Sequence, residues 1–141
     1  MRVMVLVPGD KSSETGAIPP QETIGKMMKF NEELVKAGVM LAGDGLLPTA
    51  KAKRVKFSGS QRIVFDGPFA EAKEIVGGYW IWQVKSIEEA VEWLKRAPFD
   101  GGVEVTLRPV FDPEDFAKEL SPDLREKGEA LRALVDRQRS S

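Results

Sequence analysis

Two aspartates in this chain are candidates for chemistry, because each lies beside glycine where the backbone is expected to bend. Asp44 lies between Gly43 and Gly45, and Asp66 begins the run Asp66-Gly67-Pro68-Phe69. A carboxylate in a desolvated cleft has a raised pKa and can act as a general acid or base. The alternative is structural: Asp44 would bond its own backbone, and Asp66 would start a turn that glycine and proline complete.

Other side chains are candidates for holding a ligand. Asn31 interrupts the apolar face of a predicted helix, so it either bonds to a neighbouring strand or points into a pocket. Trp82, like Trp80, could stack on a planar ligand, although tryptophans on a central strand more often belong to a core or a dimer contact. The charges that follow the turn suit the rim or lid of a cleft, and they are Glu71, Lys73 and Glu74.

Two residue types that are missing restrict the chemistry. The 141 residues include no cysteine and no histidine, which excludes disulfides, thiolate nucleophiles and histidine-dependent catalysis. A metal would have only oxygen ligands, and no spacing matches a calcium loop, so we expect no metal. No glycine-rich phosphate turn joins a strand to a helix, so we expect no nucleotide cofactor.

The charge balance also limits the partners. Lysine and arginine number 21 and aspartate and glutamate 22, so the formal net charge is -1. No global field therefore favours nucleic acid or an anionic membrane. The apolar start, Val3 to Val7, is too short for a signal peptide, and no run approaches the length of a membrane span. We expect a cytoplasmic protein that binds neither nucleic acid nor membrane.

Hydrophobic periodicity places these residues on a few elements. Segments that are apolar on both faces predict buried central strands, and these are residues 3–7 and 79–84. Strands are also expected at 39–47 and 103–110, with a hairpin from 54–57 and 62–65. Helices are expected at 21–37, from Ser86 to before Pro98, and as a tail from Ser121-Pro122. The loop at 9–20 contains Glu14, a charge that either contributes to a ligand site or is simply solvated.

With the hairpin treated as an insertion, the order of elements is β-α-β-β-α-β. That order predicts an α+β, ferredoxin-like sheet whose first and third strands are central. The two doubly apolar segments are the ones that this topology makes central, which supports the prediction. We expect a ferredoxin-like domain at residues 1–116 and a C-terminal helical tail at residues 117–141.

One face of such a sheet is left uncovered by the two helices. It would expose Trp80 and Trp82, or else Tyr79 and Ile81. An aromatic patch of this size is rarely exposed on a monomer. We therefore favour face-to-face pairing with a second copy, and the alternative is that the tail helix covers the face.

Three motifs resemble those of the YCII-related family, in its DGPF-domain branch. They are Phe30-Asn31-Glu32-Glu33-Leu34, Gly43-Asp44-Gly45-Leu46 and the nine residues that begin at Asp66, and the resemblance extends from Met1 to about Phe116. It implies a dimeric α/β barrel of ferredoxin-like protomers. A related branch contains a dehydrochlorinating enzyme with a histidine–aspartate pair. Asp44 would correspond to that aspartate, whereas Leu47 stands where many DGPF relatives have the histidine.

Two functions fit these features. The first is an enzyme or binding protein that takes a small organic molecule in a cleft formed by Asn31, Asp44, Asp66 and Lys73, with carboxylate acid–base chemistry. The second is a non-catalytic accessory or regulatory protein that acts through its dimer surface. A link to a sigma factor follows from the resemblance alone, because DGPF members are often encoded beside extracytoplasmic-function sigma factors.

Overall fold

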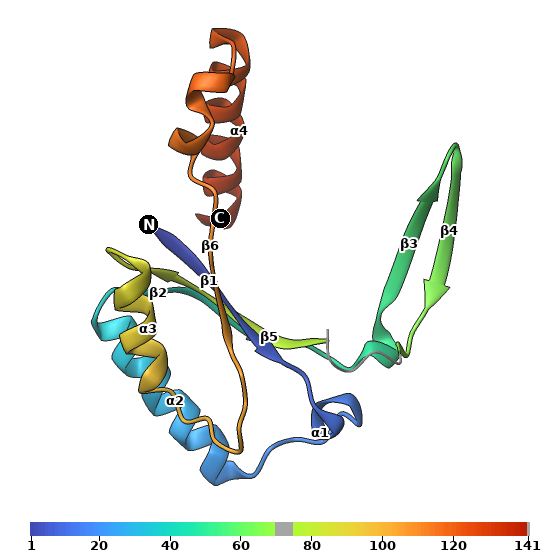
Figure 1. Ribbon diagram of the computed structural model, residues 1–141, viewed down its shortest axis with the longest axis vertical. Coiled ribbons are helices and arrows are strands. Elements are labelled where there is room, and N and C mark those ends of the chain that lie inside the picture. The colour runs from blue at the N-terminus through green and yellow to red at the C-terminus, as the bar shows by residue number, and fades with distance from the viewer. Residues whose placement is uncertain (70–74, 141) are drawn as a thin grey trace. The chain divides into compact units, whose positions relative to one another are not determined.

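A computed structural model describes residues 1–69 and 75–140 of the chain (Figure 1). The chain forms two compact units, Met1–Val110 and Phe111–Ser141, and each is described by itself. The expected domains at 1–116 and 117–141 remain a prediction. None of the helices in the described residues is long and apolar enough to cross a membrane.

The first unit is built on a four-stranded antiparallel sheet with the order β2-β5-β1-β6. Its strands are β1 (Arg2–Pro8), β2 (Met40–Gly45), β5 (Val76–Gln83) and β6 (Thr106–Pro109). The two doubly apolar segments are therefore the central strands, as predicted. In the register, Val5 lies opposite Trp80 and Val3 lies opposite Trp82. Because side chains alternate along a strand, these four residues share one face of the sheet.

Two helices, α2 (Gln21–Lys36) and α3 (Ile87–Lys95), cover that face. They lie next to each other on the same side of the sheet in Figure 1. Phe30 and Leu34 of α2 and Ala90 of α3 are buried in one core with the side chains of β1 and β5. The Ser86 hydroxyl caps α3 by accepting a hydrogen bond from the Glu89 amide, as its capping-box sequence predicts.

The sequence left open which tryptophan face is covered, and the structure answers this. Trp80 is 6% exposed and Trp82 is 0% exposed, both on the helix side. The opposite face carries half-buried Tyr79 and Ile81. Their neighbours on β1, at the registers that face the same way, are Leu6 and Met4. The predicted pairing with a second copy would use this face.

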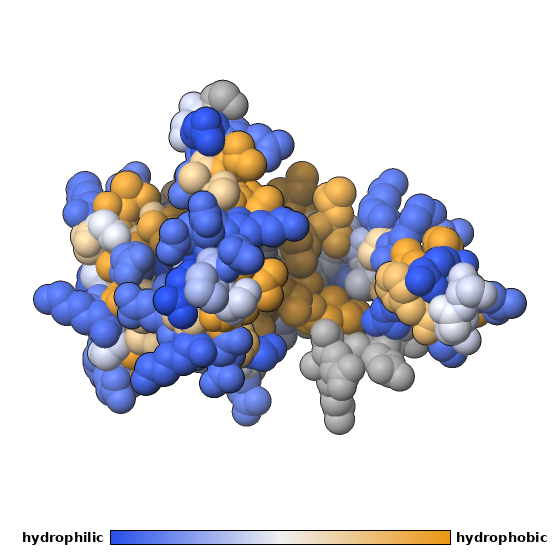
Figure 2. All heavy atoms as spheres, turned by 90° about the horizontal axis from the view of Figure 1, so that it is seen from above, coloured by the Kyte–Doolittle hydropathy of each residue, from blue (hydrophilic) through white to orange (hydrophobic). Residues whose placement is uncertain are grey.

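The predicted hairpin is present as a two-stranded sheet of its own, β3 (Lys53–Ser58) and β4 (Gln61–Asp66). Every residue of both strands is exposed. Figure 2 shows hydrophobic side chains among hydrophilic ones on the hairpin, which is at the right of both views. The exposed large hydrophobic residues are Val55, Phe57, Ile63, Val64 and Phe65.

Two segments differ from the sequence prediction. The long loop at 9–20 contains a short helix, α1 (Lys11–Glu14), which forms because Asp10 and Ser13 cap it reciprocally. The last strand is shorter than the predicted 103–110, since β6 pairs with β1 only over Thr106–Pro109. Just before this strand, Gly101 and Gly102 adopt positive φ angles. They form a turn, so the backbone pairing with β1 begins only at Thr106.

The second unit consists of two short 3₁₀ turns and one long helix. The turns are η3 (Pro113–Asp115) and η4 (Ala117–Glu119), and the helix is α4 (Pro122–Ser140). The Leu124 amide donates to the Ser121 hydroxyl at 3.2 Å, so the predicted serine cap with proline in the first turn is confirmed. In the segment that precedes α4 in the sequence, the rings of Phe111 and Phe116 meet edge to face, with 5.7 Å between their centroids.

Candidate functional site

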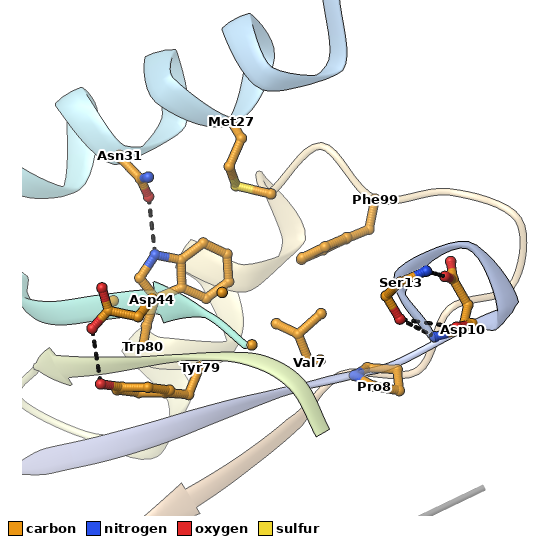
Figure 3. A pocket seen from close by; sticks show the side chains of 14 residues that line it. Val7, Pro8, Asp10, Ser13, Met27, Asn31, Asp44, Tyr79, Trp80 and Phe99 are labelled. Carbon is orange, nitrogen blue, oxygen red and sulfur yellow. Dashed lines mark hydrogen bonds between the residues drawn. The ribbon is translucent and has the colours of Figure 1, made fainter. Parts of the chain in front are cut away.

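A cavity of about 320 Å³ lies on the helix side of the sheet, where the chain leaves β1 (Figure 3). Helix α2 contributes Met27 and Asn31, and Phe99 lies across from them. The apolar surface inside is formed largely by Val7 and Trp80. The remaining lining residues are Pro8, Asp10, Ser13, Gly43, Asp44, Gly45, Gly77, Gly78 and Tyr79.

Trp80 is held in place from two directions. Its indole Nε1 donates a hydrogen bond of 2.9 Å to Oδ1 of Asn31. Its ring meets Phe30 and Phe99 edge to face, with centroid distances of 5.9 and 6.1 Å. The Asn31 side chain thus finds the partner that a polar group on an apolar helix face requires. Asn31 therefore bonds to a neighbouring strand and also lines the pocket.

Gly43 explains why the indole can lie against the edge strand. A Cβ atom at this position would be 2.5 Å from Cδ1 of Trp80 and 2.9 Å from Cε of Met40. Carbon atoms do not approach so closely, so any side chain here would displace the indole. The glycine before Asp44 therefore serves packing, and it leaves the neighbouring carboxylate at the edge of the pocket.

Asp44 is exposed on β2 at the edge of the pocket. It lies opposite Tyr79 of β5 in the register, so its side chain shares the face of the sheet that α2 and α3 do not cover. The Tyr79 hydroxyl donates a hydrogen bond of 2.9 Å to Oδ2 of Asp44. This bond, and then the negative charge of Asp44, raise the pKa of Tyr79, since ionisation would lose the bond and place two anions together. The second oxygen, Oδ1, accepts no hydrogen bond from any residue that the structure describes. One carboxylate oxygen is thus free to accept a proton or a hydrogen bond.

The far end of the pocket is formed by the start of α1. The Ser13 amide donates to the Asp10 carboxylate at 2.7 Å, and the Asp10 amide donates to the Ser13 hydroxyl at 2.8 Å. These polar groups satisfy each other, so they shape the pocket more than they recognise a ligand. Gly77 lies close to this turn, because a Cβ on it would be 3.0 Å from the Cα of Gly9.

The structure places Asp66 and Glu14 in other contacts. Asp66 and Lys53 form an exposed ion pair of 2.5 Å across the hairpin. Glu14 accepts hydrogen bonds from the amide and the hydroxyl of Thr49. The Thr49 hydroxyl in turn accepts the Phe69 amide at 3.1 Å. Neither acidic residue lines the pocket that Asn31 and Asp44 share.

The turn that begins at Asp66 packs closely against Thr49. A Cβ on Gly67 would be 1.6 Å from the carbonyl oxygen of Thr49, so only glycine fits there. The Gly67 amide donates to the Ala52 carbonyl at 2.9 Å. These contacts agree with the turn role considered for the segment, and they connect it to α1 through Glu14.

The remaining candidates fall outside the pocket or outside the described residues. Trp82 is packed in the core, and its indole N–H has no hydrogen-bond partner in the described part of the chain. Lys73 and Glu74 belong to residues 70–74, outside the described residues. Tyr79 was not foreseen as the partner of Asp44. The run Gly77-Gly78-Tyr79, with two small residues before a polar aromatic one, was the available signal.

The charge and polarity of the pocket follow from this lining. Among the described residues that form it, the ionised groups are the carboxylates Asp10 and Asp44, and none is lysine or arginine. The described part of the chain has no group of three or more acidic residues that could hold a metal. The arrangement can hold a small, partly apolar molecule against Trp80 and Asn31.

Comparison with known proteins finds one family model and two similar proteins. The model of the YCII-related domain matches residues 1–113. The uncharacterized protein R00369 of Rhizobium meliloti (strain 1021) is 32% identical over 86 aligned residues, in a match that covers 58% of this chain and 69% of that protein. A solved structure of 5-chloro-2-hydroxyhydroquinone dehydrochlorinase (TftG) from Burkholderia phenoliruptrix AC1100, in complex with 2,5-dihydroxybenzoquinone, is 14% identical. The match covers 81% of this chain and 98% of that one, with a TM-score of 0.41.

Proposed function

Because the chain belongs to the family of YCII-related domains, we propose that it binds a small organic molecule in the pocket beside Trp80. The observation that carries this proposal is the cavity of about 320 Å³, whose lining combines apolar side chains with the polar residues Asn31 and Asp44. Its volume is in the range of small-molecule sites, and such sites combine apolar lining with a few polar groups. Tight positioning of Trp80 by Asn31 and Gly43 supports a preformed pocket.

Asp44 is the residue that would carry chemistry. Its Oδ2 is held by Tyr79, while its Oδ1 is free within the described residues. A carboxylate held in this way can take a proton from a bound molecule and return it. We propose proton abstraction by Asp44 at the edge of the pocket as the reaction class, without any step through histidine, which the chain lacks.

We also propose that a second copy of the chain covers the other face of the sheet. The face opposite α2 and α3 carries Met4, Leu6, Tyr79 and Ile81. A half-apolar face of this kind is suited to self-pairing about a two-fold axis.

A thermal-shift screen of small fragments tests the proposal. The expected result is a set of fragments that stabilise the protein and lose this effect in the Asp44→Asn variant. Asp66→Asn is the matched control, since it changes the same residue type in the hairpin, away from the pocket. If no fragment stabilises the protein and Asp44→Asn keeps its role in the cell, the small-molecule function is wrong and the accessory role is favoured.

A further inference from the structure

The Asn31 amide can take only one orientation beside Trp80. The indole N–H donates and cannot accept, so the atom of Asn31 that lies 2.9 Å from the indole nitrogen has to be the carbonyl oxygen. Turning the amide over would set two donors against each other and leave the indole N–H, on a side chain that is 6% exposed, without an acceptor. The two N–H groups of Asn31 are therefore not used by Trp80, and neither has a partner among the described residues.

The indole cannot move aside to release the amide. Its ring is in edge contact with Phe30 and Phe99. On the side of β2, a Cβ at Gly43 would be 2.5 Å from the ring, so the strand already lies directly against it. Because the indole is held in this way, its hydrogen bond holds the amide as well. The pocket therefore has a preorganised hydrogen-bond donor, which a ligand can use without paying to order it.

The lining around this donor is mostly apolar. Met27 lies one turn before Asn31 on α2, so the two side chains share one face of the helix. Figure 3 shows both directed from α2 toward the sheet, with Val7 and Phe99 further along the pocket. A ligand that fills this space displaces solvent from the amide. If the ligand brings no acceptor of its own, the Asn31 N–H is left unpaired, which weakens binding.

From these observations we infer that the pocket selects a small, largely apolar and uncharged molecule that carries an acceptor oxygen, as in an aryl ketone. The oxygen accepts a hydrogen bond from Asn31, and the ring lies among Met27, Phe99 and Val7. An anion would also supply an acceptor, but the described lining residues include no lysine or arginine to balance its charge. The inference rests on the proposed function, because it names the chemical class that the same pocket binds.

Two probes of nearly the same shape test the inference on the full-length protein. Acetophenone carries a carbonyl oxygen where α-methylstyrene carries a methylene group. Asn31 is the single asparagine of the chain, so labelling asparagine with nitrogen-15 gives one side-chain NH₂ pair in a proton–nitrogen NMR spectrum. Acetophenone is expected to move one proton of this pair saturably to lower field, as a new hydrogen bond does. α-Methylstyrene is expected to move neither proton to lower field.

Asn31→Asp separates the donor from the packing. The new side chain keeps an acceptor oxygen for Trp80 but has no N–H. The affinity for acetophenone relative to α-methylstyrene is expected to fall about fivefold, the size of one lost hydrogen bond. The ratio is the readout, because the two probes differ in hydration and the variant adds a charge. Gln61→Glu makes the same amide-to-acid change on the exposed hairpin and is expected to leave the ratio unchanged.

The outcomes separate this inference from the proposed function. If Asn31→Asp leaves the ratio unaltered, or if both probes act alike on the Asn31 signals, the inferred selectivity is wrong. Binding that is lost in Gly43→Ala would then still support a ligand site beside Trp80. If neither probe binds at millimolar concentration while other fragments stabilise the protein, the inference is wrong and the proposed function remains. If the fragment screen finds nothing either, both are overturned.

Discussion

The indole nitrogen of Trp80 donates a hydrogen bond of 2.9 Å to the side-chain oxygen of Asn31, which joins the central strand β5 to helix α2. Trp80 is only 6% exposed, so its N–H has little access to water if this acceptor is lost. The contact thus has two consequences. It fixes the indole inside the pocket, and it leaves both N–H groups of the Asn31 amide without a partner among the described residues.

Asn31→Ala is therefore expected to destabilise the protein by about 1–3 kcal/mol, since it leaves a buried donor unsatisfied. Asn31→Asp keeps an oxygen in the same place and is expected to lose less than half as much. Urea denaturation measured by tryptophan fluorescence gives both values. Equal losses in the two variants would show that the hydrogen bond to Trp80 does not contribute.

Gly43→Ala is expected to destabilise by about 1–3 kcal/mol, because the added Cβ would be 2.5 Å from the Trp80 ring. Gly45→Ala is the matched control on the same strand, where a Cβ would meet nothing within 4 Å. Its change is expected to lie within about 0.5 kcal/mol of zero. Similar unfolding free energies for the two variants would contradict the close packing of Trp80 on β2.

Tyr79 is the single tyrosine of the chain, so its ionisation can be followed directly by tyrosinate absorbance. Its pKa is raised above the ordinary value of about 10 by the hydrogen bond to Asp44 and by that residue's charge. The stabilisation is therefore complete below about pH 10 and is lost as the pH rises through the raised pKa. Asp44→Asn is expected to lower the midpoint, and Asp66→Asn is expected to leave it in place.

The control for this titration is the protein unfolded in urea. In urea, the wild-type protein and the Asp44→Asn variant are expected to have the same titration midpoint for Tyr79, since unfolding removes the hydrogen bond between Tyr79 and Asp44. If Tyr79 titrates at the same pH in the folded wild-type protein and in the folded Asp44→Asn variant, Tyr79 and Asp44 do not interact.

Ile81→Asp is expected to shift the protein from dimer to monomer, because it places a charge in the centre of the face proposed to pair. Val35→Asp introduces the same charge at an exposed position of α2 and is expected to remain dimeric. Light scattering at micromolar concentration measures the mass of each. If the wild-type protein has the mass of a monomer, the proposed dimer is wrong.

Much of the fold follows from the sequence because burial leaves a clear pattern. A strand apolar on both faces, as at Val3 to Val7, has to be central, and the sheet order confirms it. The covered face could not be predicted from this pattern, because both faces of β5 are apolar or aromatic. It depends on which side α2 packs, and the large rings of Phe30, Trp80 and Trp82 meet there.

The candidate site was less predictable, because its contacts depend on register. Asp44 lies opposite Tyr79 only after the irregularity between Met40 and Ala42, which hydrophobic pattern does not reveal. The ion pair of Asp66 with Lys53 depends in the same way on the register of the hairpin. Asn31 was identifiable from sequence, since a polar residue on an apolar helix face has to find a partner.

The central claim, a ligand pocket beside Trp80, is tested most directly by the indole N–H resonances of the three tryptophans in a proton–nitrogen NMR titration. Each tryptophan is assigned by its phenylalanine variant, and a fragment that stabilises the protein in the thermal-shift screen is added as the ligand. The expected result is a saturable shift of the Trp80 resonance, whose side chain lines the cavity. Trp93 on α3, outside this lining, is expected to stay in place. A Trp80 resonance that does not move, or one that moves no more than that of Trp93, would contradict the claim.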